Sequence, residues 1–376
     1  MLCKMKEKKY EIRVIQLFET YGEVYQPYIS PVIQALKADT KLHVDVVAFN
    51  AHDTVDFFVP RYKKRWLKEK WYALTHNSRL NYLEILCLEQ QAAIIHVQQS
   101  YLFSKVTNLL DLPRDQRPLV VITLRGGDTY VKPWYAKKWQ DFYKNYGHVV
   151  DAFVVMSNHQ KNYLHDKWGV SLERVHVIPI SFGQAFNASI KQADPSVMRI
   201  VSAFRMCWEK NIAGNLLAVK ILKDRGIHVQ YHLYGDGADS GQAYYLIDKY
   251  NLQDCVAYHG RLDNSELKAQ LKRYDFYLQL SYSESLGMSV IEAQSQGIPA
   301  IVSNSDGLPE VVVHNQTGFC VAPHDSEAAA THLLQLWQNP DLYKQFSQEA
   351  IAFSHQHFSV ETEVEALRRL YKSLIP

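Results

Sequence analysis

The sequence predicts an α/β protein that contains two doubly wound parallel sheets, and three observations lead to this fold class. Short runs rich in β-branched residues alternate with longer helical patterns along the 376 residues, which is the order of elements in strand–helix–strand units. Several of these runs are almost continuously apolar, as expected of parallel strands that are buried on both faces. The alternation is interrupted once near the middle of the chain, so we expect two sheets rather than one.

Each half of the chain carries its own series of strand signals. In the first half the expected strands are Ile12–Phe18, Val44–Phe49, Ile94–Val97, Leu119–Leu124, Ala152–Met156 and Val175–Ile178. In the second half they are Arg199–Phe204, His228–Tyr234, Val256–His259, Phe276–Leu280, Ala300–Ser303 and Gly318–Val321, followed by a last helical pattern at Val360–Leu374. Both series fit Rossmann-like domains of similar size.

The interruption lies at 187–198, a polar stretch that lacks apolar periodicity. Such a composition is typical of an interdomain linker. We therefore expect an N-terminal domain at 1–186, a C-terminal domain at 199–358, and a last segment at 359–376 whose helix packs back on the N-terminal domain. Ligands of doubly wound sheets bind at the carboxyl ends of the strands, here in a cleft between two facing domains.

Composition and charge exclude several classes of protein. The 41 Lys and Arg residues balance 39 Asp and Glu residues, so the overall charge does not favour a nucleic-acid partner. The five cysteines form no CxxC pair, which indicates a reducing compartment rather than a disulfide framework or a zinc site. The first residues form no apolar leader, and no stretch reaches the roughly 20 apolar residues that cross a bilayer. We expect a cytoplasmic protein, with association to the inner face of a membrane left open.

The stretch Ser281–Asp325 carries the clearest chemical signal. It begins at the end of an apolar strand and enters a loop that precedes a predicted helix at Gly287–Gln296. Glu284 lies in the loop, and Glu292 lies in the second turn of the helix. Because ionised carboxylates only accept hydrogen bonds, this pair suits the hydroxyl groups of a sugar and a ribose.

Cationic and backbone groups near this stretch indicate a phosphate site. The amides of Leu286, Gly287 and Met288 would stand free at the helix start, where an anion is favoured. Arg205 and Lys210 follow a buried strand and are spaced so that both could converge on a diphosphate. Taken singly, these residues also fit ordinary surface carboxylates and ion pairs with Asp236 or Glu209, so we weigh them as a set.

Together the segments resemble the C-terminal domain of glycosyltransferase family 4, the retaining enzymes of GT-B fold. The Glu-x7-Glu motif of that family is similar to Glu284 and Glu292, and its Arg-x4-Lys pair is similar to Arg205 and Lys210. Its Gly-Asp-Gly turn resembles Gly235–Gly237, and its later segment resembles GLPEVVVHNQTGFCVAPHD. The order of these motifs along the chain makes the resemblance specific.

The resemblance implies a role for each of these residues. Glu292 would bind the ribose hydroxyls, and Glu284 would contact the donor sugar as part of the catalytic group. Arg205 and Lys210 would hold the diphosphate and neutralise charge on the leaving nucleotide. The other implied donor-binding positions are Leu286, Gly287, Met288, Gly235, Asp236 and Arg261, together with Gly22 in the N-terminal domain.

The N-terminal half resembles the family less closely. Its first loop has Gly22 followed by Glu23, where the family often has two adjacent glycines near the donor phosphates. Arg125 stands where the family often has His, and it is followed by two glycines and Asp128. Because Arg stays protonated it cannot act as a base, so we expect it to bind phosphate or an acidic acceptor. We expect Arg125 and Asp128 to lie on the acceptor or donor-sugar side of the site. His96, at a strand end, either lies there too or is a structural residue.

The segment Arg61–Leu74 mixes six cations, one acid and four aromatic residues. As a helix it is either an ordinary solvated element with a buried Trp edge or a patch for anionic lipid headgroups or a lipid-diphosphate acceptor. Trp134–Trp139 repeats the same chemistry. We therefore keep peripheral membrane contact through Arg61–Trp71 as one hypothesis.

The sequence has no Asp-x-Asp between apolar strands, so we expect transfer without a metal and without a cofactor besides the donor. The resemblance implies a hexosyltransferase that moves a sugar from a UDP- or GDP-linked donor to a hydroxyl of a glycan or lipid-linked acceptor, with retention, in cell-surface polysaccharide biosynthesis. The alternatives are a nucleotide-sugar epimerase or sugar phosphorylase of the same fold, or a silent sugar-nucleotide binder.

Overall fold

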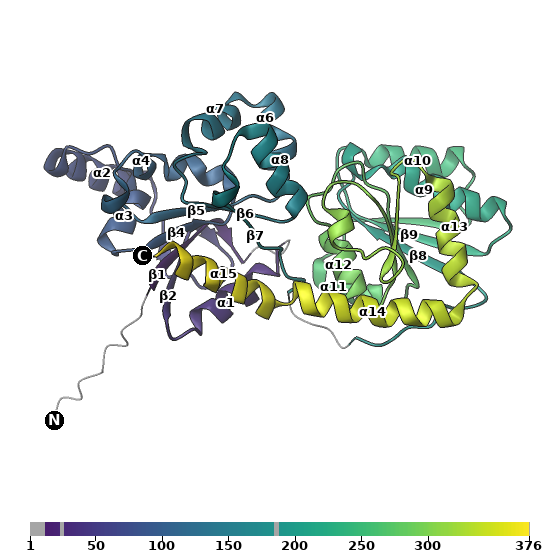
Figure 1. Cartoon of the computed structure of the whole chain (residues 1–376). Helices are drawn as coiled ribbons and strands as arrows, with labels where there is room; N and C mark the ends of the chain where they lie inside the picture. The colour runs from purple at the N-terminus through teal and green to yellow at the C-terminus, as the bar shows by residue number, and fades with distance from the viewer. Residues whose placement is uncertain (1–11, 23–25, 184–187, 376) are drawn as a thin grey trace. The chain divides into compact units, whose positions relative to one another are not determined.

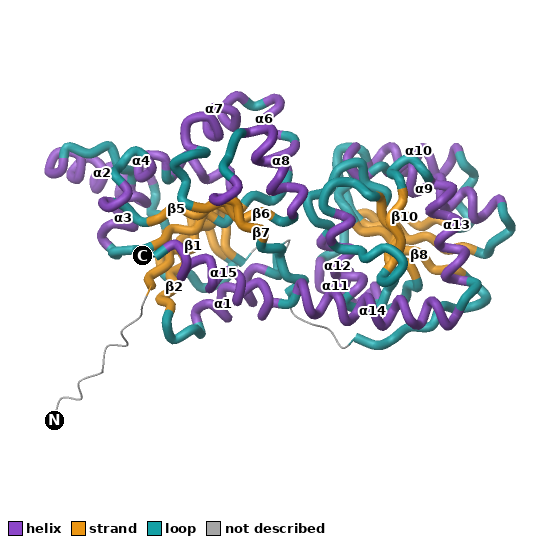
Figure 2. The backbone as a smooth tube through the Cα atoms, in the orientation of Figure 1, coloured by secondary structure: helices purple, strands orange, loops and turns teal. Residues whose placement is uncertain are grey.

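The computed structural model describes residues 12–22, 26–183 and 188–375. The chain divides into two compact units: unit 1 is Met1–Pro179 with Val360–Pro376, and unit 2 is Ile180–Ser359. Each unit contains one parallel sheet flanked by helices (Figure 1, Figure 2). The two doubly wound sheets predicted from the sequence are therefore confirmed.

Unit 1 is built on a seven-stranded sheet of order β3-β2-β1-β4-β5-β6-β7. Every neighbouring pair is parallel. The strands are β1 Ile12–Tyr21, β2 Leu42–Ala51, β3 Phe57–Phe58, β4 Ile94–Val97, β5 Leu119–Thr123, β6 Ala152–Val155 and β7 Val175–Val177. The helices are α1 Ile29–Lys37, α2 Tyr62–His76, α3 Tyr82–Glu89, α4 Thr107–Leu110, α5 Gly127–Tyr130, α6 Lys132–Tyr135, α7 Lys137–Tyr146, α8 Asn158–Trp168 and α15 Val360–Leu374, with short 3-10 turns η1 Ser100–Lys105, η2 Arg114–Gln116 and η3 Leu172–Arg174.

Unit 2 is built on a six-stranded parallel sheet of order β10-β9-β8-β11-β12-β13. The strands are β8 Met198–Ala203, β9 Val229–Tyr234, β10 Val256–Gly260, β11 Phe276–Gln279, β12 Ala300–Ser303 and β13 Gly318–Val321. The helices are α9 Ile212–Asp224, α10 Ser240–Lys249, α11 Asn264–Leu271, α12 Met288–Gln294, α13 Ser326–Trp337 and α14 Pro340–Phe358, with short turns η4 Trp208–Lys210 and η5 Leu308–Glu310.

The order of the strands fixes where ligands would bind within each unit. In unit 1 the chain direction across the sheet reverses between β1 and β4, and in unit 2 it reverses between β8 and β11. Loops diverge at such a switch point and leave a crevice at the carboxyl ends of the strands. Gly22 follows β1, and Arg205 and Glu284 follow β8 and β11, so these predicted residues lie on the loops that leave the switch points.

The last helix belongs to unit 1 although unit 2 precedes it in the chain. Ser359 has an extended backbone that separates α14 from α15, and α15 packs against α1 (Figure 1). Its apolar face buries Val364, Leu367, Leu370 and Tyr371. The bounds of this helix are those that the sequence predicts.

The expected linker at 187–198 does not separate the two units. The contacts divide the chain at Pro179, and the described part of this stretch lies within unit 2. Lys191 Nζ donates to the carbonyl oxygens of Lys272 and Tyr274 at 2.9 and 2.7 Å, which fixes the segment at the end of α11. Its composition is that of a loop, but this lysine anchors it to the domain that follows. Residue 187 lies outside the described residues.

The short strand β3 was not predicted. It has only two residues and forms the edge of the sheet next to β2, where Phe58 is 58% exposed. A strand this short leaves no alternation of apolar and polar residues from which to recognise it.

Candidate functional site

Lys210 and Glu284 meet at the switch point of unit 2. Lys210 ends the turn η4 after β8, and Glu284 lies in the loop after β11. Lys210 Nζ forms an ion pair with Glu284 Oε2, and the two side chains are 13% and 17% exposed. Gln279 Nε2 donates to the same carboxylate oxygen at 2.9 Å. The pair is therefore held in place from two sides by groups of one strand and one turn.

Asn211 explains why Lys210 faces that loop. Its backbone is left-handed, with φ 50°, a conformation that Asn tolerates better than most residues. Its side-chain amide donates to Leu280 O at 2.9 Å and Pro323 O at 2.7 Å, and its side-chain oxygen caps α9 at Gly214 N. Asn211 thus ties the start of α9 to the segments that follow β11 and β13.

Arg205 is the most accessible cation of this group. Its side chain is 72% exposed, and its closest carboxylate is Glu209 Oε1 at 3.7 Å rather than Asp236. Such an exposed pair contributes little to stability, so Arg205 can turn to an anion at little cost. A hydrogen bond with Cys207, with the charges of Glu209 and Glu284, raises the pKa of Arg205, so the guanidinium stays charged.

Glu292 lies on α12 and is almost fully buried, with a side chain 5% exposed. Lys268 Nζ lies 3.3 Å from Glu292 Oε1, and Asn264 Nδ2 donates to the same oxygen at 3.0 Å. Both partners come from α11. Within the described part of the chain, no hydrogen-bond donor contacts the second oxygen, Oε2. One side of this carboxylate is therefore fixed, and the other can accept hydrogen bonds from a ligand.

A hydrogen-bonded network connects the surroundings of the two glutamates. Tyr277 Oη donates to Ser289 Oγ at 2.7 Å and accepts from Ala203 N at 3.0 Å. Burial, with a contribution from the charge of Glu292, raises the pKa of Tyr277, so the hydroxyl remains a donor. Tyr277 also contacts Gln279, the residue that holds Glu284. The strand β11 thus holds Glu284 through Gln279 and, through Tyr277, contacts the helix that carries Glu292.

The loop before α12 needs two glycines. Gly287 has φ 105°, and a Cβ there would lie 2.8 Å from Leu308 Cδ2. A Cβ on Gly307 would lie 2.2 Å from Ser285 O. Asp306 completes the loop by accepting from Glu284 N at 3.2 Å and from a neighbouring serine hydroxyl. The observed helix, Met288–Gln294, is shorter than the predicted Gly287–Gln296, because Gly287 and Gly297 both have positive φ.

The turn at Gly235 packs directly on the loop of Arg205. A Cβ on Gly235 would lie 1.8 Å from Phe204 O, so no other residue fits there. Asp236 accepts from Gly237 N and from Ser240 Oγ, and these bonds, with the charge of Arg261, lower the pKa of Asp236. Asp236 therefore stabilises the turn as a carboxylate. The structure brings Leu286 and Met288 to the start of α12, as expected from the sequence.

His96 is a core residue of unit 1. It is fully buried at the end of β4, where Nδ1 lies 2.7 Å from Tyr371 Oη and Nε2 lies 2.7 Å from Thr123 Oγ1. Burial, with the charge of Arg125, lowers the pKa of His96 to about 3. A neutral histidine with both nitrogens bonded inside the core acts structurally, so the structural alternative fits the geometry and the functional one does not.

Arg125 and Asp128 occupy the loop after β5. Asp128 is buried and accepts from Arg125 N and Gly126 N, each at 3.0 Å, and from the hydroxyl of Ser100. Its carboxylate is saturated by this loop, which makes it a structural residue rather than one free for an acceptor. The Arg125 guanidinium donates to Gln98 and lies over the ring of Tyr28 at 5.8 Å.

Gly22 follows β1 with φ 78°, and a Cβ there would lie 2.7 Å from Asp53 Cβ. The glycine is thus required by packing against the loop after β2. Glu23 lies outside the described residues.

Sequence reasoning missed several residues that shape this site. Lys268 and Asn264 lie on a helix that reads as an ordinary polar element, and Gln279 and Asp306 belong to no motif. Only their contacts with Glu292 and Glu284 reveal them. Since each depends on a partner distant in the sequence, no local signal could have identified them.

The helix α2 contains no buried residue. Trp66 and Trp71 are 45% and 59% exposed, so the buried Trp edge expected of an ordinary solvated helix is absent. Lys70 Nζ lies over the Trp66 ring at 4.9 Å. In the second patch Trp134 is exposed but Trp139 is buried in the core. No described helix has the length and apolar character needed to span a membrane.

Two family models match the chain. Residues 186–353 match the model of the glycosyl transferases group 1, and residues 28–180 match the model of glycosyltransferase family 4. The first match covers most of unit 2 and the second covers most of unit 1.

Individual relatives are more distant. The chain is 28% identical over 177 residues to the amylovoran biosynthesis glycosyltransferase AmsK of Erwinia amylovora, a match that covers 45% of this chain and 44% of AmsK. The chain spans less than half the length of the curated relatives that it matches.

Two solved structures are similar over almost the whole chain. Sucrose-phosphate synthase from Thermosynechococcus elongatus gives a TM-score of 0.72 at 18% identity, covering 96% of this chain and 99% of the other. HepE of Anabaena, solved with UDP and glucose, gives 0.71 at 15% identity, covering 96% and 100%. At these identities the likeness concerns the fold.

Proposed function

The chain belongs to glycosyltransferase family 4 and has the GT-B fold, and from this premise we propose that it transfers a sugar from a nucleotide-diphosphate donor to a hydroxyl of a glycan or lipid-linked acceptor. The donor would bind at the switch point of unit 2. Polysaccharide biosynthesis is the setting of the relative AmsK, and we extend it to this chain as part of the proposal.

The observation that carries the proposal is the state of Glu292. A buried carboxylate is costly unless it is paired and hydrogen-bonded, yet Glu292 has only one oxygen held by α11. Its second oxygen would accept the two ribose hydroxyls of a nucleotide. Lys268 and Asn264 hold the carboxylate in one orientation, so the acceptor geometry exists before the ligand binds.

The remaining charges suit the diphosphate and the sugar. Arg205 is exposed and stays cationic, and Lys210 lies at the switch point beside Glu284. As the bond between the anomeric carbon and the diphosphate breaks, negative charge grows on the leaving oxygen. Two cations that face this oxygen would stabilise that charge without a metal ion. Glu284 would accept a hydrogen bond from the donor sugar, and the acceptor hydroxyl would attack with retention of configuration.

Binding of nucleotides to wild type and to Glu292→Gln tests the donor site. The screen uses UDP, GDP, ADP and CMP with their common sugars, and UDP is the first choice because HepE was solved with it. A ligand that binds only the folded state adds about 2.7 kcal/mol at 100 times its Kd, so it must raise the melting temperature. Glu266→Gln is the matched control, since Glu266 is an exposed glutamate on α11.

We expect one nucleotide to stabilise wild type and the control but not Glu292→Gln. If no nucleotide stabilises the protein, or if Glu292→Gln responds as wild type does, the donor site is wrongly assigned. Release of the nucleotide from its sugar in the presence of candidate acceptors then separates transfer from silent binding.

The exposed aromatic and cationic side chains of α2 support a second part of the proposal, peripheral contact with an anionic membrane surface. Lys63 and Lys64 have no ion-pair partner within the described residues, and Trp66 and Trp71 project apolar surface beside them. Aromatic rings with free cations suit the interface of anionic lipids. A lipid-linked acceptor would be presented at that surface.

Sedimentation with vesicles tests this contact. We expect binding to vesicles with phosphatidylserine, little binding to pure phosphatidylcholine, and a loss of at least tenfold in Trp66→Ala/Trp71→Ala. Tyr245→Ala is the control, because Tyr245 is an exposed aromatic residue of unit 2. Equal binding by both variants would rule out α2 as the contact.

A further inference from the structure

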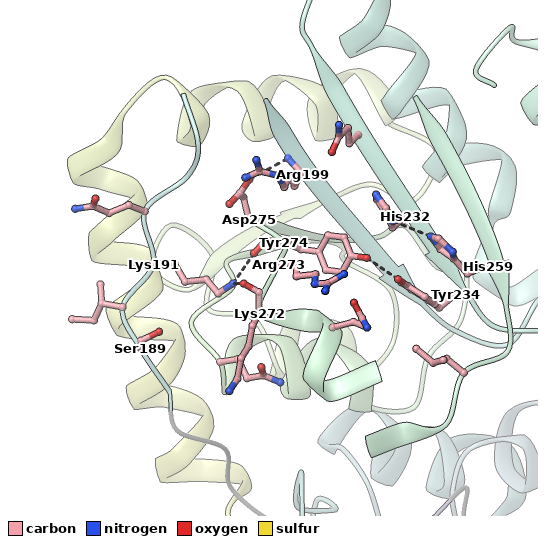
Figure 3. Close-up of a pocket in the computed structure, with 16 residues that line it drawn as sticks. Ser189, Lys191, Arg199, His232, Tyr234, His259, Lys272, Arg273, Tyr274 and Asp275 are labelled. Carbon is pink, nitrogen blue, oxygen red and sulfur yellow. Dashed lines mark hydrogen bonds and ion pairs between the residues drawn. The ribbon is translucent and has the colours of Figure 1, made fainter. Parts of the chain in front are cut away.

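Unit 2 contains a hollow that shares no residue with the predicted donor site. It has a volume of about 1010 Å³ and is lined by β9, the end of β10, the start of β8, the segment after α11 and the stretch 189–192 (Figure 3). Binding pockets for small molecules commonly measure about 300–1,000 Å³. This one is large enough for a ligand of several rings.

Aromatic and imidazole rings form one wall of this pocket. His259 stacks on His232 and on Tyr234, with ring centroids 5.0 and 4.6 Å apart and an angle of 15° between the planes in each case. His232 Nδ1 lies 2.9 Å from His259 Nε2, and the hydroxyls of Tyr234 and Tyr274 lie 2.7 Å apart. These contacts hold the rings together, and Figure 3 shows the two hydrogen-bonded pairs.

The charge of the pocket is positive and partly uncompensated. Lys191 donates hydrogen bonds to backbone carbonyl oxygens just after α11, and Arg199 forms an ion pair with Asp194 at 2.7 Å. Lys272 and Arg273 are exposed, and within the described part of the chain neither forms an ion pair. Among the described residues that line the pocket, Asp275 is the only one with a carboxylate, and it lies 4.0 Å from Arg199.

Arg273 is the cation that faces the ring wall. Figure 3 shows its guanidinium beside the ring of Tyr274, among the side chains of the pocket. The pKa of His232 is lowered mainly by burial, and the charges of His259 and Arg273 lower it further. The charge of Arg273 also acts on Tyr274, where it opposes the rise in pKa that burial causes. A cation beside neutral imidazoles, without a carboxylate of its own, is a site that an anion would satisfy.

Neutral amides complete the lining. Gln230 and Gln270 offer both donors and acceptors. Gln296 also lines the pocket, and both polar atoms of its buried amide lack a hydrogen-bond partner among the described residues. A buried amide without partners is rare in a folded protein and calls for an explanation. A polar ligand with several hydroxyl groups would use amides of this kind.

We propose that this pocket binds an oligosaccharide segment that carries a carboxylate or a phosphate, with Arg273 on the anionic group and the ring wall and amides on the sugar rings. The size excludes a single small anion as the intended ligand, and the amides favour hydroxyl-rich rings over a purely apolar ligand. The site would retain a charged glycan away from the donor site. The biological role as a holding site for acceptor or product rests on the proposed function, but the binding itself does not.

Direct titration of the full chain tests the inference. The probe is a tetrasaccharide of alternating glucuronate and N-acetylglucosamine, and its neutral counterpart is the N-acetylglucosamine tetramer. Inorganic phosphate is the third arm. Binding is followed by calorimetry, and the ring signals of His232 and His259 in NMR spectra report whether the ligand lies in this pocket.

We expect the charged tetrasaccharide to bind, to shift both histidine signals, and to bind at least tenfold more tightly than the neutral tetramer, as loss of a charge-assisted hydrogen bond implies. Arg273→Gln should lose about tenfold or more, and Lys344→Gln should bind as wild type, since Lys344 is an exposed cation on α14 outside the pocket. The third arm distinguishes the two anionic groups. If phosphate alone binds and shifts the same histidine signals, and the glucuronate probe binds at least tenfold more weakly than phosphate, the anionic group of the natural ligand is a phosphate.

Several results would overturn the inference. These are equal binding of the charged and neutral tetramers without binding of phosphate, equal losses in Arg273→Gln and Lys344→Gln, unchanged histidine signals, or no binding of any probe. Nucleotide binding is measured on the same variants. Arg273→Gln should keep it, which shows that the variant is folded, and Glu292→Gln should keep tetrasaccharide binding. If the protein binds nucleotide but not the tetrasaccharide, the proposal for the pocket fails. If it binds the tetrasaccharide but not nucleotide, the proposal for the donor site fails.

Discussion

Replacing Lys268 by Met should lower the local stability around Glu292, the buried carboxylate of the donor site. Lys268 and Glu292 have side chains 7% and 5% exposed, and Nζ lies 3.3 Å from Oε1. Lys268→Met leaves the carboxylate with Asn264 as its remaining partner, because the other oxygen has none among the described residues. Breaking a buried ion pair by removing one partner costs about 3–5 kcal/mol. At about 1.4 kcal/mol per factor of ten, local opening becomes roughly 100- to 5,000-fold more frequent.

Hydrogen exchange of the backbone amides of α11 and α12 is the suitable assay. It reports the local free energy of opening, whereas a two-unit chain has no single unfolding transition. Lys272→Met is the matched control, since Lys272 is exposed just after α11 and forms no ion pair within the described residues.

The double variant Lys268→Met/Glu292→Gln removes both charges and should lose less protection than the sum of its two single variants. Residues in one ion pair couple by about 0.5–3 kcal/mol. Additive losses to within about 0.5 kcal/mol, or a loss in Lys268→Met no larger than in the control, would refute the assignment of Lys268 as the partner of Glu292.

Three further predictions concern other parts of the molecule. Tyr371→Phe should destabilise the docking of α15 by about 1–3 kcal/mol, because His96 and Gln16 both lose a buried partner; faster exchange in α15 but not in α14 checks this, and unchanged exchange would contradict it. Unit 1 should lose stability below pH 6.5, since His96 has a pKa of about 3 in the folded chain, so the unfolded chain binds the extra proton. The loss of stability is about 1.4 kcal/mol per pH unit between pH 6.5 and 3. Amide exchange in β4 should therefore depend more steeply on pH in wild type than in His96→Gln, and an equal pH dependence in both would contradict the prediction. Gly287→Ala should weaken nucleotide binding and destabilise the loop by about 1–3 kcal/mol, because of φ 105° and a Cβ 2.8 Å from Leu308; Gly241→Ala, where a Cβ meets nothing within 4 Å, is the control, and equal effects would contradict it.

Much of the fold could be predicted because parallel strands buried on both faces are nearly continuous apolar runs. Ile94–Val97, Ala300–Ser303 and Gly318–Val321 have the predicted bounds for this reason. β1 and β2 extend further than predicted, since their polar ends still pair, as Thr20 does with Asn50. Such pairing depends on the neighbouring strand and leaves no trace in the local pattern.

The site could be predicted where its chemistry lies in a short motif and not where it depends on partners distant in the sequence. The spacing of Glu284 and Glu292 identifies them as a pair, but not that Lys210 and Lys268 are their partners. His96 was placed at the site because it lies at the end of a strand, and Asp128 because it follows one. In the structure the hydrogen-bonding groups of both side chains are already paired, in the core for His96 and within the loop for Asp128. A position after a strand says where a residue lies and not whether it is free.

Hydrogen exchange of wild type with and without the stabilising nucleotide is the decisive test of a donor site at the switch point of unit 2. We expect added protection at 205–210 and 283–294, the segments that carry Arg205, Lys210, Glu284 and Glu292, and no such protection in Glu292→Gln. Protection confined to other segments, or the same protection in the variant, would contradict a donor site built on these residues.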